Sequence, residues 1–167
     1  MEIIQNAVLK ISNIEDPESF KEFLEEEGEA FVDFIDDDIE NSTEIEVDEM
    51  YEVFDDMMET LKQMVKNFPK IKFTVNGEEE TTYDGFRYEI EYNDGTMTIK
   101  SSERYYKRYP ENYNEFVDFC EDMHIKNEIE EEEWEALNED IDGDWYFIEG
   151  VEAKTSIKLS NKQVIKL

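Results

Sequence analysis

Histidine, cysteine and closely spaced carboxylates are the side chains in this chain of 167 residues that could carry out chemistry. His124 is the only imidazole and Cys120 the only thiol. They lie four residues apart on a predicted helix, but two ligands are too few for a zinc site and the sequence has no second pair. A catalytic base or nucleophile would have to come from this small set or from the carboxylates. We therefore expect a protein that is not an enzyme and needs no cofactor.

The segment 138–149 has the spacing of a calcium-binding loop. Oxygen ligands fall at positions one, three, five and twelve, and a glycine falls at position six. The ligands would be Asn138, Asp140, Asp142 and Glu149. Position one is asparagine where aspartate is usual, and the residues after position twelve have strand character where a helix is usual. Acid-rich chains also produce such spacing by chance, so calcium binding is an alternative hypothesis.

Acidic residues dominate the composition, with 47 Asp and Glu against 16 Lys and Arg and a formal net charge of −31. Nucleic-acid phosphates and anionic membrane surfaces repel such a chain, so we expect direct binding to neither. Residues 1–60 contain 22 acids and two bases, and residues 111–152 contain 17 acids and one base. Residues 153–167 contain four lysines and no acid. Salt adaptation would spread acids over the whole surface, so this pattern favours a dedicated negative face.

Two runs within these blocks carry an acid at about every second residue. A helix rises ~1.5 Å per residue and each DNA strand has one phosphate per ~3.4 Å, so this spacing approximates the charge density of a strand. Repulsion within the runs costs stability, which favours an intermolecular role over a solvated face that only maintains solubility. We predict that they form the partner-binding face. The first run comprises Glu25, Glu26, Glu27, Glu29, Asp33, Asp36, Asp37, Asp38 and Glu40, and the second comprises Glu128, Glu130, Glu131, Glu132, Glu133 and Glu135.

In its small size and clustered acidity, this chain resembles the DNA-mimic inhibitors of bacteriophages and mobile elements. The resemblance is one of class and rests on no sequence motif. It implies a phage-type anti-CRISPR, anti-restriction or repair inhibitor that binds the basic nucleic-acid-binding groove of a nuclease or other DNA-processing enzyme.

An immunity protein or antitoxin that neutralises a basic nuclease toxin is the alternative, because acidity also gives fast association with such a toxin. Partner-specific contacts would come from a basic tail and an aromatic cluster. The tail comprises Lys154, Lys158, Lys162 and Lys166, and the cluster comprises Tyr105, Tyr106, Tyr109 and Tyr113.

The expected location is the cytoplasm of a bacterial host cell. The N-terminus lacks the basic start and long apolar stretch of a secretory signal, and no apolar run reaches membrane-spanning length. A single cysteine fits a reducing compartment.

Hydrophobic periodicity predicts an α+β fold, in which amphipathic helices pack on an antiparallel β-sheet in a single compact acidic domain, residues 1–167. Helical spacing predicts that residues 1–68 are a mainly helical acidic part, with helices near 3–11, 17–35 and 47–68. Alternation predicts a β-hairpin sheet over 70–101, with turns at Gly77 and at Asn93-Asp94-Gly95. A second helical acidic part is expected over 111–140, and C-terminal strands are expected over 144–167.

Overall fold

The computed structural model describes residues 3–27, 31, 39–81, 84–107, 112–122, 124, 126–140, 146–148 and 157–167. Helices and an antiparallel sheet are both present, so the predicted α+β class is confirmed. The elements follow the order β1 (Ile4–Ser12), α1 (Pro17–Glu26), β2 (Thr43–Met50), α2 (Phe54–Asn67), β3 (Lys72–Glu80), β4 (Asp84–Asn93), β5 (Thr96–Ser101), β6 (Tyr105–Lys107), α3 (Tyr113–Asp122), α4 (Glu131–Asp140), β7 (Tyr146–Ile148) and β8 (Asn161–Lys166).

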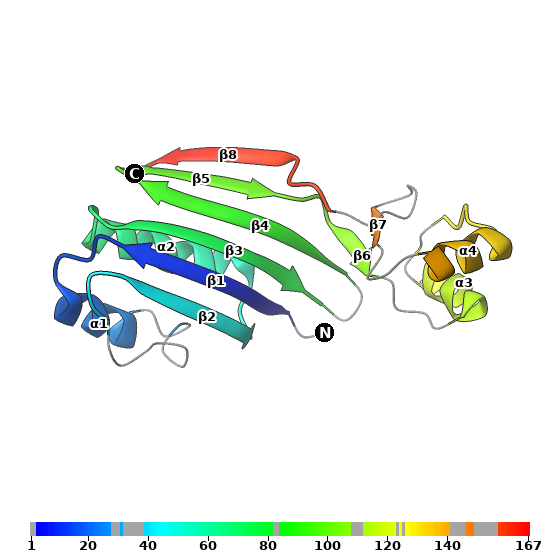
Figure 1. The fold of residues 1–167 in the computed structure, drawn as a ribbon, viewed down its shortest axis with the longest axis horizontal. Helices are drawn as coiled ribbons and strands as arrows, with labels where there is room; N and C mark the ends of the chain where they lie inside the picture. The colour runs from blue at the N-terminus through cyan, green and yellow to red at the C-terminus, as the bar shows by residue number, and fades with distance from the viewer. Residues whose placement is uncertain are drawn as a thin grey trace.

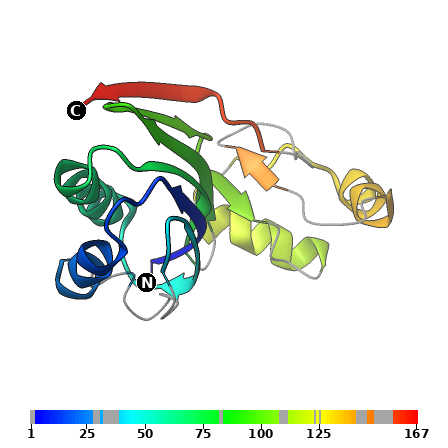
Figure 2. The ribbon, with the colours of Figure 1, turned by 60° about the vertical axis from the view of Figure 1, so that its left-hand side comes forward.

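The main sheet has the strand order β2-β1-β3-β4-β5-β8, and each neighbouring pair is antiparallel. The short strand β6 pairs with β4 and with β7. α1 and α2 lie behind the sheet in the view of Figure 1. The turned view shows the two helices side by side on that face (Figure 2).

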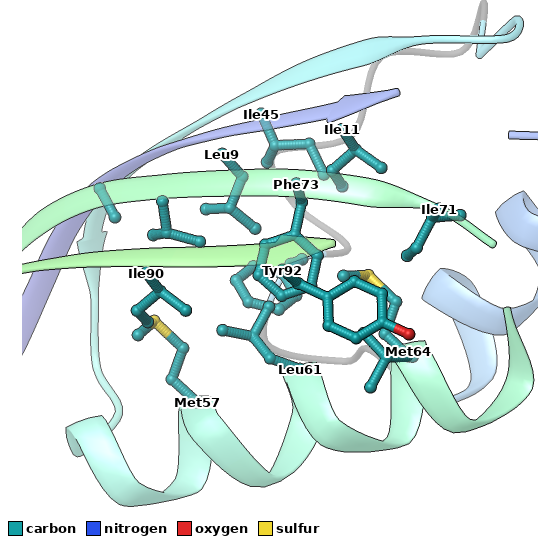
Figure 3. Close-up of a cluster of buried hydrophobic side chains, with 14 of the residues drawn as sticks. Leu9, Ile11, Ile45, Met57, Leu61, Met64, Ile71, Phe73, Ile90 and Tyr92 are labelled. Carbon is teal, nitrogen blue, oxygen red and sulfur yellow. The ribbon is translucent and has the colours of Figure 1, made fainter. Parts of the chain in front are cut away.

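The hydrophobic core lies between this face and the two helices. α1 buries Phe20, Phe23 and Leu24, and α2 buries Met57, Met58, Leu61, Met64 and Val65. These side chains meet alternate residues of the strands, among them Leu9, Ile45, Phe73, Ile90 and Tyr92 (Figure 3). The spacing of three and four residues that predicted α2 is therefore the spacing of its buried face.

α1 begins where its capping residues predict. The Asp16 carboxylate accepts hydrogen bonds from the backbone N–H and the hydroxyl of Ser19, and these bonds lower the pKa of Asp16. Pro17 occupies the first turn, where its missing N–H has no cost.

The predicted helix at residues 3–11 is wrong. These residues form most of β1, which buries Gln5, Ala7, Leu9 and Ile11 on one face. β1 pairs with β2 on one side and β3 on the other, so its backbone hydrogen bonds are made with segments distant in the sequence. Such non-local pairing outweighs a local pattern that fits both helix and strand.

The start of the predicted helix 47–68 is also wrong. Val47 and Met50 lie in β2, and α2 begins at Phe54. β2 pairs along β1 and buries Ile45 and Val47 against the core, which fixes this stretch as a strand. The described part of residues 1–68 therefore contains two strands and two helices, where a mainly helical part was predicted.

Gly77 lies inside β3, not in the predicted turn. A β-carbon at this position would lie 2.7 Å from the Tyr88 hydroxyl and 2.7 Å from the Ala7 side chain. Glycine thus makes room for Tyr88 beneath the sheet. The second predicted turn is confirmed: Asp94 and Gly95 have φ angles of 47° and 77°, which suit a tight hairpin between β4 and β5.

α3 and α4 pack on each other at one end of the molecule, apart from the main sheet (Figure 1). The Phe116 ring stacks on Trp134 with centroids 6.1 Å apart, and the Tyr113 hydroxyl donates to the Ile129 carbonyl at 2.8 Å. Phe116, Phe119 and Trp134 are buried, but they are not part of the main core. Both helices lie in the predicted helical part 111–140, and β7 and β8 lie in the predicted part 144–167.

Candidate functional site

The first predicted acidic run begins at the C-terminal end of α1. Glu25, Glu26 and Glu27 are exposed there, and Glu40 is exposed before β2. The described members of this run therefore face solvent. Five members lie outside the described residues: Glu29, Asp33, Asp36, Asp37 and Asp38.

The second run lies on and just before α4, and every one of its members is exposed. Trp134 is buried against Phe116 of α3. Glu132, two residues before Trp134, lies on the far side of α4, whereas Glu131, three residues before it, lies on the Trp134 side. Glu131 and Glu135 are separated by one helical turn, a spacing at which like charges repel. Glu128 pairs with Lys126 at 2.9 Å, and this contact raises the pKa of Lys126. The exposed acids of this run are Glu128, Glu130, Glu131, Glu132, Glu133 and Glu135.

The described members of the two runs are not brought together. α1 and α4 lie at opposite ends of the molecule with the sheet between them (Figure 1), and the turned view keeps them apart (Figure 2). They form two separate acidic surfaces and do not make two adjacent rows like the strands of a duplex.

A third acidic segment, residues 44–59, contains eight acids and no base. Glu44, Glu46 and Asp48 are exposed at alternate positions of β2, at the edge of the sheet. Asp55 and Asp56 are exposed in the first turn of α2, where the helix dipole favours negative charge. Sequence reasoning did not single this segment out, because a helix over 47–68 distributes the acids around its surface. The alternation of acid and apolar residues from 44 to 48 was the signal for an edge strand.

The stretch between β2 and α2 exposes apolar side chains beside these acids. Tyr51 is 68% exposed and Val53 is 37% exposed. Asp48, Glu49, Tyr51, Glu52, Val53, Asp55 and Asp56 are named the β2–α2 corner below. The β1–β2 pairing shifts beside it, and Glu49 has a left-handed φ of 53°, as expected of a bulge.

Glu52 is the carboxylate at the β2–α2 corner with an unusual environment. Its side chain is half-buried, and its buried Oε2 atom accepts no hydrogen bond from the described part of the chain. Burial, and to a lesser extent the negative charge of Asp56, raise the pKa of Glu52. Both effects disfavour the charged form of Glu52.

A buried polar network supports the β2–α2 corner from below. Glu79 is 5% exposed and its carboxylate accepts hydrogen bonds from Gln5 Nε2 and from the Phe54 N–H, both at 2.8 Å. Arg104 pairs with its other oxygen at 3.1 Å. Gln5 also donates to the Glu52 carbonyl and accepts from the Tyr88 hydroxyl. The partners of Glu79 come from three parts of the chain, so we assign the network a structural role.

Cys120 and His124 do not form a reactive pair. Cys120 is buried in α3, and burial raises the pKa of its thiol to about 11, which disfavours the nucleophilic thiolate. His124 is exposed just beyond α3, where its backbone N–H donates a hydrogen bond to the Glu121 carbonyl. The described residues contain no group of three or more His, Cys, Asp or Glu side chains that could hold a metal ion.

The candidate calcium loop falls mostly outside the described residues. Asn138 and Asp140 belong to the end of α4, and nothing further is described of their side chains. Asp142 and Glu149 lie outside the described residues.

The predicted aromatic cluster does not form an exposed anchor in its described part. Tyr105 is fully buried, and its hydroxyl donates to Glu78 at 3.0 Å. Tyr113 is part of the contact between α3 and α4. Tyr109 lies outside the described residues, and of Tyr106 only the backbone is described. In the basic tail, Lys158, Lys162 and Lys166 are exposed, and Lys154 is outside the described residues.

Comparison with known proteins found no matching family model, no matching curated protein and no matching solved structure. In the part of the chain that the structure describes, no helix is both long and apolar enough to cross a membrane.

Proposed function

We propose that this chain is a non-enzymatic acidic inhibitor that binds the basic nucleic-acid-binding groove of a nuclease or another DNA-processing enzyme. The observation that carries the proposal is α4, which exposes Glu131, Glu132, Glu133 and Glu135 on a helix anchored to α3 by Trp134. These acids lie on more than one side of α4, and because α3 holds α4 in place, little conformational freedom would be lost when a cationic groove surrounds them.

The dimensions of α4 suit contact with one row of basic residues. A helix of ten residues is about 15 Å long, which corresponds to roughly four phosphates of one DNA strand. Because the α1 and α4 surfaces lie at opposite ends, we propose that α4 alone replaces one strand in the groove. This differs from the sequence prediction, in which both acidic runs form the partner-binding face.

A cytoplasmic immunity protein or antitoxin that binds a basic nuclease toxin is the second candidate. The exposed Tyr51 beside the acids of the β2–α2 corner favours it, because an aromatic anchor within complementary charge is typical of specific protein interfaces. The target separates the candidates: a cognate toxin indicates immunity, whereas a defence or repair enzyme indicates inhibition of the phage type.

The proposal is tested by displacement of labelled duplex DNA from a panel of purified nucleases, CRISPR effectors, restriction enzymes and repair glycosylases. The chain should displace DNA from at least one enzyme. Changing Glu131, Glu132 and Glu133 together to Gln should weaken displacement by about tenfold or more, as expected for several lost charge contacts. The same change at Glu25, Glu26 and Glu27 alters the net charge equally and is the matched control.

Two results would count against the proposal. Failure to displace DNA from any enzyme of the panel would contradict the function. Equal weakening by the two triple variants would show that net charge acts at long range and that α4 is not the contact surface.

A further inference from the structure

We propose that the two edges of the main sheet bind each other in neighbouring copies of this chain, so that β8 of one copy adds as a strand beside β2 of the next. The occupant of each edge is a second copy of the chain. This inference goes beyond the proposed function and does not depend on it, because it concerns neither α4 nor a DNA-processing enzyme.

Both edges are open in the part of the chain that the structure describes. There, β2 pairs only with β1, and β8 pairs only with β5. Figure 1 shows β2 at the bottom edge of the sheet and β8 at the top edge. Five of the six residues of β8 are exposed. An edge strand presents unpaired backbone N–H and C=O groups, which are a template for pairing with a strand of another molecule.

The directions of the strands allow β8 and β2 to pair without turning the second copy over. Each of the six strands of the main sheet is antiparallel to its neighbour, so β2 and β8 run in opposite directions. A copy shifted sideways across the strands would therefore place its β2 antiparallel to β8. Because the second copy is only shifted, α1 and α2 of both copies would lie on the same side of the extended sheet.

The charged side chains of β2 and β8 point to the same side of the sheet, away from the core. One row of directly opposite residues crosses all six strands on this side, and it comprises Glu46, Val8, Asn76, Glu89, Lys100 and Lys162. Side chains alternate along a strand, so Lys166 lies on this side with Lys162. For the same reason Glu44 and Asp48 lie there with Glu46.

The charges on the two edges are opposite, and they match in one register. If Lys162 lies opposite Asp48, then Lys166 lies opposite Glu44. All of β8 then lies opposite residues of β2, and Ile165 on the core side lies opposite Ile45. A shift of two residues in either direction would keep the faces but lose one of the two ion pairs. The charges therefore specify the register of the contact.

The same charges oppose contacts between identical edges. Two β8 strands would bring lysines together and two β2 strands would bring acids together, and like charges opposite each other destabilise a strand pair. Within its own sheet Lys162 lies opposite Lys100, and Lys166 lies opposite Thr96, so the opposite residues of β5 offer neither lysine a carboxylate. The β2 strand of a second copy would supply one to each. Because the contact joins two different surfaces, it can repeat from copy to copy.

The test is sedimentation equilibrium of the full chain at about 0.15 M salt, where the Debye length is about 8 Å and repulsion between distant acids is screened. The weight-average mass should rise above that of one chain as the concentration increases from about 10 μM to about 1 mM. Hydrogen exchange of the amides of β2 and β8 should slow over the same range, whereas that of α4 should not change.

Charge reversal at the two edges tests the register. Lys162→Glu combined with Lys166→Glu should weaken self-association by about tenfold or more, because both ion pairs become repulsive. Glu44→Lys combined with Asp48→Lys should have the same effect from the other edge. A mixture of the two variants has opposite charges at every contact and the same mean net charge as the parent. The mixture should therefore associate as the parent does.

Lys66→Glu combined with Lys72→Glu is the matched control, because both lysines are exposed and lie on α2 and β3, away from the two edges. It changes the net charge as much as the β8 variant and should weaken association by less than about twofold. The proposal is overturned if the parent keeps the mass of one chain up to about 1 mM. It is also overturned if the mixture associates no better than its components, or if the control weakens association as much as the edge variants.

Discussion

Gly77 shows how one residue position sets the packing beneath the sheet. An added β-carbon would lie 2.7 Å from the Tyr88 hydroxyl and the Ala7 side chain and 2.8 Å from the Asn6 carbonyl oxygen. Gly77→Ala should therefore reduce the free energy of unfolding by about 1–3 kcal/mol, the usual cost of overpacking. Urea denaturation of the two proteins measures this difference. An unchanged midpoint would mean that Tyr88 moves without cost.

Glu52 links the charge of the β2–α2 corner to stability. Burial and the charge of Asp56 raise the pKa of Glu52 in the folded protein. Its contribution to stability is therefore fully present at pH values below the pKa of an ordinary carboxyl group, and it is lost as pH rises through the raised pKa. Glu52→Gln should therefore raise the melting temperature at neutral pH and leave it nearly unchanged in acid.

Thermal unfolding at neutral and at acidic pH measures the effect of Glu52→Gln. Glu44→Gln, on the exposed face of β2, is the control. A variant less stable than the parent at neutral pH would show that the Glu52 carboxylate is satisfied in the folded state.

At the scale of elements, Glu79 connects β3 to β1 and to the start of α2. Its carboxylate accepts from Gln5 and from the Phe54 N–H, and it pairs with Arg104. Glu79→Gln keeps the shape but removes the charge, so we expect a loss of about 1–3 kcal/mol in the free energy of unfolding. Chemical denaturation tests this, and a variant as stable as the parent would contradict the assigned role of the network.

The α3–α4 pair has its own small core, which makes it a separate test. Trp134 contacts Phe116 and Tyr113, and it is not part of the main core. Trp134→Ala should speed hydrogen exchange over residues 113–140 and leave β1, β3 and β4 protected. Loss of protection in the central strands as well would show that the helical pair stabilises the sheet.

The elements also show which features a sequence can predict. α2 was recognisable because Met57, Leu61 and Met64 repeat at a helical period over several turns and Pro69 follows. β1 was not, because Ala7 and Ile11 fit both periods and its pairing with β2 and β3 is non-local. The mistaken helix start then concealed the acidic edge of β2.

At the scale of the whole molecule, the sequence predicted where acids occur along the chain but not which acids share a surface. The exposure of Glu25 and of Glu131 agrees with the predicted acidic runs, yet α1 and α4 lie at opposite ends (Figure 1). The order of the strands and helices in space decides how far apart α1 and α4 lie, and a single sequence carries little information on that order. For the same reason the β2–α2 corner, formed where a strand edge meets a helix start, emerged only from the structure.

The separation of the acidic surfaces gives the molecule several negative faces around a main core with few buried charges. Under the proposed function, each face would attract a basic partner, and the net charge of −31 would accelerate association at low salt. Specificity would then depend on exposed groups beside the charge, such as Tyr51 at the corner. An inhibitor built in this way would combine fast capture with one preferred orientation.

The salt dependence of affinity for an enzyme identified by DNA displacement tests the central claim most directly. We predict that affinity falls steeply and linearly on a logarithmic scale as salt rises, and that prior filling of the groove with duplex DNA abolishes binding. The variant with Glu131, Glu132 and Glu133 changed to Gln should show a shallower slope than the parent. Affinity that is insensitive to salt, or binding that persists with DNA in the groove, would contradict the proposal that the acidic surface replaces nucleic acid.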